Sequence, residues 1–312
     1  MSDESAQLMG ATADVVLYCK SYRRDVLRVR RLLESIERYN AERLPVFVSM
    51  PREDRALFED MIGRRADCTL IDDEDIIAAN PRVDMARTRG VPGRLSQAMI
   101  RAEFWRLGHG TNYLCIDSDS LFIADFKARD FVAPDGDCYT VIHQNKELLQ
   151  LAVNRGIDKL MAEFEHEAAQ LMKTFGRDGP VYSFMPSPFV WSAKVWRSLE
   201  ERHLQPRGLT IWDALTEKVP EYLWYGEALL AYQAIPLRPI EALFRVYHYH
   251  WQYYSMLKLG ETEAKAAKNY LGVIYQSNWQ HELDYGAPEK SLPSRALRSL
   301  KRGLRYVQNR WL

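Results

Sequence analysis

Short apolar runs alternate with helical patterns through the first 125 residues of the chain. The runs have the length of strands and stand at residues 15–19, 45–50, 68–71 and 112–116. Helical apolar spacing follows the first run from about Asp25, a second helix opens at Pro51, and a third covers residues 95–107. This alternation with short connections predicts an α/β fold with a mostly parallel central sheet and helices on both faces.

Beyond residue 125 the pattern is less regular. We expect strands at 137–143 and 239–250, an extended stretch at 180–191, and helices at 146–175 (long or broken), 193–203 and 261–275. Residues 224–230 have the pattern of a loop entering a helix. The sequence shows no internal repeat and no clear linker. It therefore predicts one domain at 1–290, with a regular half (14–125) and an elaborated C-terminal half (126–255).

Two carboxylates stand where the fourth apolar run ends. Asp117 and Asp119 are two residues apart, so on an extended chain they point the same way. Carboxylate oxygens suit Mg²⁺ or Mn²⁺ and leave coordination positions for phosphate oxygens. Because ligands of such sheets bind beyond the carboxyl ends of the strands, this motif is the first candidate for a functional site.

Other interpretations of the Asp-x-Asp motif stay open. Asp and Ser are common in solvated turns and helix caps. Phosphatases of the haloacid dehalogenase type also use Asp-x-Asp, but after the first strand and with Thr or Val two places further on. Here the motif follows the fourth run, and position 121 is Leu. A Mg²⁺-dependent phosphatase or phosphotransferase is thus an alternative, as is a non-catalytic glycan-binding protein.

Composition narrows the class of protein. The chain has 312 residues, of which 47% are hydrophobic and 27% charged, so it can bury a full core. Its formal net charge of zero does not suit a general nucleic-acid binder. The four cysteines form no Cys-x-x-Cys pair, which favours a reducing compartment. With no signal-peptide pattern and no apolar stretch of about 20 residues, we expect a cytoplasmic protein.

Several motifs together resemble the GT-A glycosyltransferases over about residues 14–255. They are Gln97 and Arg101 on the helix before the Asp-x-Asp, the run Pro186-Ser187-Pro188-Phe189, and Tyr225-Gly226-Glu227. The pattern is similar to bacterial families labelled as domains of unknown function, whose members are assigned as glycosyltransferases of polysaccharide or lipid glycan pathways. The resemblance implies a Rossmann-like GT-A fold. It also implies transfer of a sugar from a nucleoside-diphosphate donor, with UDP-sugars as the first choice, to a glycan or lipid-linked acceptor.

The resemblance also implies a metal site and a catalytic base. Asp117 and Asp119 would hold Mn²⁺ or Mg²⁺, and His248 is the candidate third ligand, with a core histidine as the alternative. Glu227 is the candidate base that deprotonates the acceptor hydroxyl, and Asp213 is the second choice. An ordinary glutamate at a helix N-terminus is the alternative for Glu227.

Two further groups of residues follow from the same resemblance. The donor pocket is expected to gather residues near the ends of the strands and at the start of the helix before the metal strand: Tyr18, Lys20, Asp73, Arg94, Gln97 and Ser118. The sugar or acceptor pocket is expected to include Pro188, His250 and Trp251, because aromatic faces stack well on sugar rings.

The C-terminal segment 291–312 carries a separate signal. Its apolar residues repeat at three and four positions beside a stripe of arginines, and it contains no acidic residue. This pattern predicts a basic amphipathic helix for the surface of an anionic membrane, peripheral on the inner face of the cell membrane. A helix docked on its own domain or on a second subunit is the alternative.

Overall fold

A five-stranded sheet forms the centre of the molecule. The computed structural model describes residues 13–277, except 89, 145, 155, 157 and 217, and the single positions 293, 300 and 304. The strand order is β3-β2-β1-β4-β7. The bounds are β1 Ala13–Lys20, β2 Val46–Met50, β3 Cys68–Asp72, β4 Gly110–Cys115 and β7 Phe189–Ser192. The first four strands are parallel and β7 runs antiparallel to β4, which confirms the predicted mostly parallel, Rossmann-like α/β sheet.

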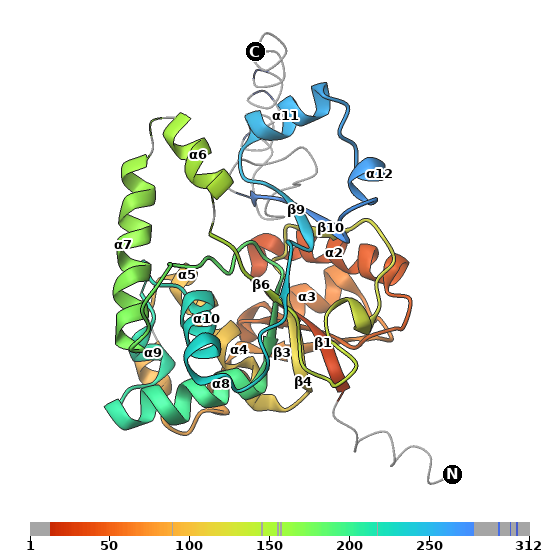
Figure 1. Cartoon of the computed structure of the whole chain (residues 1–312). Coiled ribbons are helices and arrows are strands. Elements are labelled where there is room, and N and C mark those ends of the chain that lie inside the picture. Colours follow the sequence, from red (N-terminus) through yellow and green to blue (C-terminus); the bar gives the residue numbers. More distant parts are fainter. Residues whose placement is uncertain are drawn as a thin grey trace, which may run out of the picture.

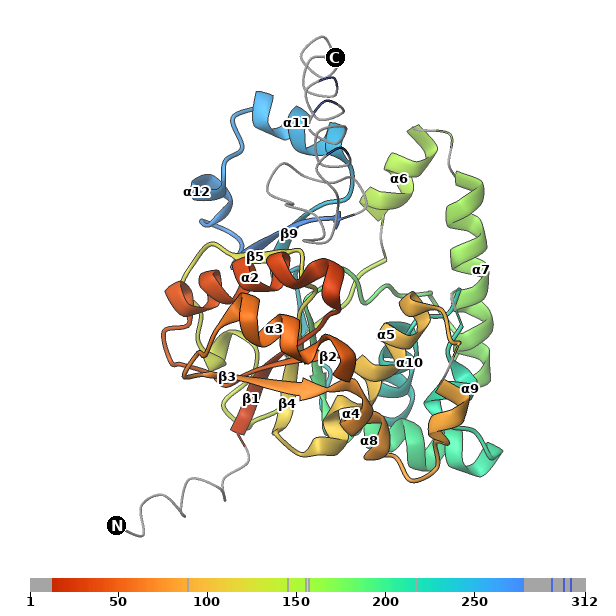
Figure 2. The ribbon, with the colours of Figure 1, turned by 180° about the vertical axis from the view of Figure 1, so that it is seen from behind.

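Helices cover both faces of this sheet (Figures 1 and 2). One face carries α2 (Val26–Tyr39) and α3 (Arg55–Ile62), which connect β1 to β2 and β2 to β3. The other face carries α5 (Gly93–Glu103), α8 (Ala193–Leu199) and α10 (Glu221–Tyr232). This division follows from right-handed crossovers, because the sheet grows away from β1 in one direction and then resumes on its other side at β4. The apolar stripe predicted for α2 is fully buried.

Further helices and helical turns lie between these elements along the chain. α4 (Asp73–Ala78) follows β3 directly, and α9 (Ile211–Ala214) precedes α10. The predicted helix at 146–175 is broken into α6 (Lys146–Asn154) and α7 (Asp158–Thr174). Single helical turns are η1 Arg23–Asp25, η2 Arg52–Asp54, η3 Met85–Thr88, η4 Phe104–Leu107, η5 Ala128–Asp130, the π turn η6 Glu200–Leu204 and η7 Gln205–Arg207.

A second sheet lies beyond the carboxyl ends of the central strands (Figure 1). It has the order β5-β10-β9, with β5 Ser120–Phe122, β10 Gly272–Tyr275 and β9 Phe244–Tyr247. Helices α11 (His250–Lys258) and α12 (Glu263–Ala266) accompany it. A separate two-stranded sheet pairs β6 (Thr140–Val141) with β8 (Pro239–Ile240). Because β5 begins directly after the Asp-x-Asp, the second sheet is built onto the candidate site.

Several predicted elements of the C-terminal half are wrong. The helix expected at 261–275 is the single turn α12 followed by strand β10. A strand forms there because Val273 and Ile274 are buried between two neighbouring strands. At Gly272 a Cβ atom would stand 2.3 Å from the Phe244 ring, so the close approach of β9 requires glycine. The strand expected at 239–250 ends at Tyr247, and the strand expected at 137–143 shrinks to β6.

One large apolar core joins both halves of the described chain. Its buried side chains extend along the sequence from Val15 to Ile274. A smaller cluster of aromatic residues, including Tyr247, Tyr253 and Tyr275, lies under the second sheet. Among the described helices, none has the length and apolar character needed to cross a membrane.

Candidate active site at the carboxyl edge of the sheet

The Asp-x-Asp motif lies at the point where the strand order of the central sheet reverses. From β1 the chain builds β2 and β3 on one side, and β4 then pairs with the other side of β1. The backbone N–H of Ile116 donates to the carbonyl of Tyr18 at 2.8 Å, so the two strands leave the sheet together. The crevice at such a switch point is where open α/β sheets bind their ligands. Lys20, at the end of β1, and Asp117, just after β4, belong to this edge.

The two aspartates have different partners. Asp117 is half-buried, and Arg101 Nη1 donates to its Oδ1 at 2.7 Å. Asp119 is also half-buried, and its Oδ2 accepts the backbone N–H of Ser277 at 2.8 Å. Ser118 between them is buried. The motif is therefore held on one side by α5 and on the other by the residue that follows the second sheet.

Negative charge exceeds positive charge around the motif. Arg101 also donates to the buried carboxylate of Glu221, so one guanidinium serves two carboxylates, and Asp119 stands near Asp117 as a third. Burial raises the pKa of Asp119, the charge of Asp117 raises it further, and the Ser277 N–H and Arg28 act in the opposite direction. Arg28 is also paired with Asp25, and the charge of Asp25 raises the pKa of Asp119. Two half-buried carboxylates with this excess charge fit a hard divalent cation.

The candidate third ligand, His248, follows strand β9 of the second sheet, the sheet that is built onto the Asp-x-Asp motif. The carbonyl of Asp119 accepts the N–H of Tyr275, and Tyr275 pairs with Tyr247, the residue before His248. Burial and the nearby Arg245 lower the pKa of His248, which favours the neutral imidazole that a metal requires. However, no three His, Cys, Asp or Glu side chains come together as a metal site within the described part of the chain. His248 as a ligand therefore stays a prediction.

Two of the residues predicted for the donor pocket form a buried ion pair. Lys20 Nζ lies 2.8 Å from Asp73 Oδ2 and also donates to the carbonyl of Ser21 at 2.6 Å. Burial raises the pKa of Asp73 to about 6, although Lys20 opposes the shift. Asp73 Oδ1 and the Ser21 hydroxyl are buried, and neither has a hydrogen-bond partner within the described part of the chain. These unpaired polar atoms are suited to a polar ligand, because burying them unpaired costs free energy.

Tyr18 has a different position from the one expected. It is fully buried, its ring stacks on Phe104 with centroids 3.8 Å apart, and its hydroxyl lies 2.9 Å from Ser49 Oγ. A side chain in the middle of a strand that faces the helix layer cannot line an open pocket. Tyr18 is therefore a core residue that supports the end of β1 from below.

Helix α5 carries a row of polar side chains toward the motif. Arg94, Gln97 and Arg101 follow one another at three and four positions, which places them on one face. Exposure decreases along the row: Arg94 is exposed, Gln97 half-buried and Arg101 nearly buried, where it meets Asp117. With a rise of about 1.5 Å per residue, the row spans about 10 Å.

The residues predicted for the acceptor side are placed by their neighbours in the sheets. Phe189 pairs with Cys115, and this antiparallel register brings Pro188 alongside Ile116, next to the motif. His250 and Trp251 are the first residues of α11 rather than the end of a strand. Their side chains lie outside the described part of the structure, as does segment 291–312 apart from residues 293, 300 and 304.

Glu227 is not at the first turn of a helix. α10 begins at Glu221, so Glu227 lies in the middle of the helix, and the prediction that a loop enters a helix within 224–230 is wrong. Both of its carboxylate oxygens accept from Arg177, at 2.7 and 2.8 Å. The carboxylate that the first turn does deliver is Glu221, which sequence reasoning missed. Pro220 directly before it was the available signal for a helix start. The contact of Ser277 with Asp119 had no signal in the sequence.

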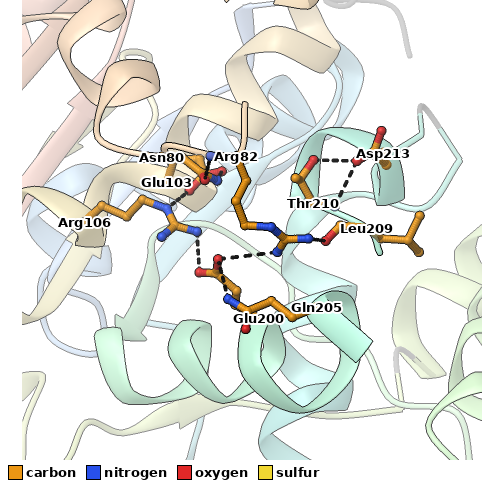
Figure 3. Close-up of polar contacts among 9 residues, drawn as sticks. All are labelled: Asn80, Arg82, Glu103, Arg106, Glu200, Gln205, Leu209, Thr210 and Asp213. Atoms are coloured by element: carbon orange, nitrogen blue, oxygen red, sulfur yellow. Dashed lines mark hydrogen bonds and ion pairs between the residues drawn. The ribbon is translucent and has the colours of Figure 1, made fainter. Parts of the chain in front are cut away.

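Asp213, the second candidate base, caps a helix. Its Oδ2 accepts from the backbone N–H and the hydroxyl of Thr210, at 2.9 and 2.6 Å, in a capping box that starts α9. Figure 3 shows it beside a polar network that joins α5 to the turns η4, η6 and η7. In this network Glu103 and Glu200 share Arg106. The remaining members are Asn80, Arg82, Gln205 and the carbonyl of Leu209.

Comparison with known proteins identifies a family. The model of a family of unknown function, DUF6492, matches residues 11–285. No curated protein matches the chain. Among solved structures, the chain is similar to one described as the apo structure of the bifunctional glycosyltransferase WbbM, at 14% sequence identity and a TM-score of 0.46. The match covers 86% of this chain but only 46% of that one, and it does not by itself assign an activity.

Proposed function

Since the chain belongs to the DUF6492 family, whose function is unknown, we propose its activity from the site: a metal-dependent glycosyltransferase that uses a nucleoside-diphosphate sugar. The observation that carries the proposal is the position of Asp117 and Asp119, two carboxylates with excess negative charge at the switch point of a mostly parallel sheet. Such a position favours a ligand that arrives with a divalent cation.

In this proposal the aspartates hold Mn²⁺ or Mg²⁺, with the His248 ring as a further candidate ligand. The ion, when bound, would neutralise charge on the departing diphosphate. Asp117 and Asp119 present oxygen atoms, the hydrogen bond from Arg101 orients Asp117, and the backbone N–H of Ser277 orients Asp119.

The donor would lie along the edge between Lys20 and α5. The Lys20–Asp73 pair is on the nucleoside side, and Ser118 belongs to the motif itself. The row Arg94, Gln97 and Arg101 spans about 10 Å, which suits a sugar diphosphate. Pro188, His250 and Trp251 belong to the side where the second half of the chain would receive a glycan or lipid-linked acceptor. UDP-sugars are the first donors to test.

A ligand screen tests the proposal directly. The full chain is heated with nucleoside diphosphates and nucleotide-sugars, each with Mn²⁺ or with a chelator, and the midpoint of unfolding is recorded. We expect one nucleotide class to raise the midpoint with Mn²⁺ only, and the matching sugar donor to be hydrolysed slowly. No shift with any nucleotide and metal would contradict the proposal.

The same material separates the alternatives. A phosphatase or phosphotransferase would form an aspartyl-phosphate from a phosphomonoester, which mass spectrometry detects. A non-catalytic glycan-binding protein would be stabilised by glycans equally well with and without chelator. Either result would replace the glycosyltransferase assignment.

Membrane attachment through residues 291–312 is a separate part of the proposal. The basic and apolar stripes of this segment suit an anionic surface, and a lipid-linked acceptor would require such a location. Deleting 291–312 should release the protein from anionic liposomes in a sedimentation assay and leave donor hydrolysis unchanged. Equal liposome binding by the full and shortened chains would contradict it.

A further inference from the structure

We infer that Arg101 and Glu221 act together as a positioning pair for the Asp-x-Asp motif, an inference that rests on the proposed function. Arg101 comes from the last turn of α5 and Glu221 from the first turn of α10. The guanidinium donates to Glu221 with Nη2 and to Asp117 Oδ1 with Nη1. The sequence drew attention to Arg101 on the helix before the motif, but it did not predict the pairing with Glu221.

The burial of the pair argues against a merely incidental contact. The Glu221 side chain is 1% exposed and that of Arg101 13%, whereas Asp117 is 31% exposed. Of the three charged side chains, those of Glu221 and Arg101 thus lie mainly in the protein interior, and that of Asp117 is the most exposed to solvent. Placing an ionised carboxylate in the interior is costly unless it is paired, so Glu221 depends on Arg101.

Glu221 changes what Arg101 does to the aspartates. With Asp117 as its only partner, the positive charge of Arg101 would cancel one of the two carboxylates that face a cation. Glu221 offsets that charge, so Asp117 and Asp119 keep a net negative field while Asp117 stays oriented by a hydrogen bond. Partners one step behind a metal ligand commonly change metal affinity about 10- to 100-fold when they are removed.

The pair also joins the two halves of the chain. α5 belongs to the regular half and α10 to the elaborated half, and Arg101 is the link between α10 and the metal edge. The first turn of α10 is therefore connected to Asp117 by the Arg101 side chain. We assign Arg101 and Glu221 the role of positioning residues.

The test is a double-mutant cycle on Mn²⁺ affinity, measured by calorimetry on the full chain without nucleotide. Glu221→Gln and Arg101→Lys should each weaken Mn²⁺ binding about tenfold. The double variant should be no weaker than the worse single variant, because Glu221 acts only through Arg101. Additive losses, or unchanged affinities, would overturn the inference.

Glu227→Gln is the matched control. It breaks an equally buried arginine–glutamate pair in the same helix, but its partner is Arg177, so Mn²⁺ affinity should stay within about twofold of wild type. An equal loss in this control would show that any damage to α10 weakens binding, and would overturn the pairing. If Glu221→Gln does not fold, Glu221→Asp keeps the charge, withdraws the carboxylate from Arg101 by one methylene and should still weaken binding.

The cycle also separates this inference from the proposed function. A wild-type chain that binds no Mn²⁺ contradicts the metal-dependent function and the pairing with it. A wild-type chain that binds Mn²⁺ while all three Arg101 and Glu221 variants bind it equally well contradicts the pairing alone.

Discussion

Two clusters of arginines and carboxylates differ in their balance of charge. In the network of Figure 3, Arg82 and Arg106 face Glu103 and Glu200, so positive and negative charges are equal. At the carboxyl edge of the sheet, Arg101 pairs with both Asp117 and Glu221 while Asp119 stands near Asp117, so carboxylates outnumber the arginine that they share. The balanced cluster is complete as it stands, whereas the unbalanced one is suited to a cation.

The balance of charge is one criterion that separates a structural network from a functional one. Both clusters contain buried glutamates and a shared arginine, so burial and ion pairing alone do not distinguish them. The position of each cluster relative to the strand ends is the second criterion. The balanced network joins helices on one face of the sheet, while the unbalanced one lies beyond the strand ends where such sheets bind ligands. The predictions below test whether the two clusters respond as differently as their charges imply.

Arg106→Met should give the largest change in stability. It leaves Glu103 and Glu200 buried without their shared partner, which should lower the free energy of unfolding by about 3–5 kcal/mol. Urea denaturation measures the loss. Mn²⁺ affinity of the folded variant should not change, because the network is complete without a metal.

Arg43→Met is the control for that measurement. Its partner Asp67 is exposed, and such surface pairs contribute about 1 kcal/mol or less. A loss as large as that of Arg106→Met would show that removal of any paired arginine unfolds this protein, and would remove the distinction between the two clusters.

Asp119→Asn, in the unbalanced cluster, should leave metal-free stability nearly unchanged and remove the stabilisation by Mn²⁺. In metal-free buffer the free energy of unfolding should change by no more than about 1 kcal/mol, because the substitution removes one of several like charges. At a Mn²⁺ concentration 100 times its dissociation constant, the wild type should gain about 2.7 kcal/mol and the variant nothing. Urea denaturation with and without Mn²⁺ measures both. A metal-free loss of several kcal/mol would place Asp119 in a structural network.

Acid should weaken the balanced region through His203, which shares the π turn with Glu200. Burial, followed by the charge of Arg207, lowers the pKa of His203 from 6.5 to about 4. Because the unfolded chain takes up the proton first, stability is fully present above pH 6.5 and is lost as the pH falls toward 4. Between pH 7 and 5, wild type should lose about 1 kcal/mol more than His203→Asn, because solvent screens part of the effect. Parallel loss in both proteins would contradict the buried, neutral histidine.

The regular half of the fold could be predicted from the sequence. Each apolar run before residue 116 is a strand of the central sheet, and the stripe at Val26, Val29, Leu33 and Ile36 is buried. Local periodicity was sufficient there because every strand is covered by its own neighbouring helix.

The elaborated half depended on contacts that sequence spacing does not contain. Residues 272–275 form a strand only because β5 and β9 flank them, and they lie about 150 residues from β5 along the chain. The candidate site shows the same limit. Asp117, Asp119 and the α5 face could be recognised from local pattern, whereas Glu221 and Ser277 reach the motif only through the tertiary fold.

The binding of UDP to the wild type and to Asp119→Ala, each with Mn²⁺ and with a chelator, tests the central claim most directly. Calorimetry on the full chain should show wild-type binding that requires Mn²⁺. The account predicts that Asp119→Ala weakens this binding about 100-fold or more, equivalent to about 2.7 kcal/mol, while the variant stays folded. Equal UDP affinity in both proteins, or wild-type binding that is indifferent to the chelator, would contradict it.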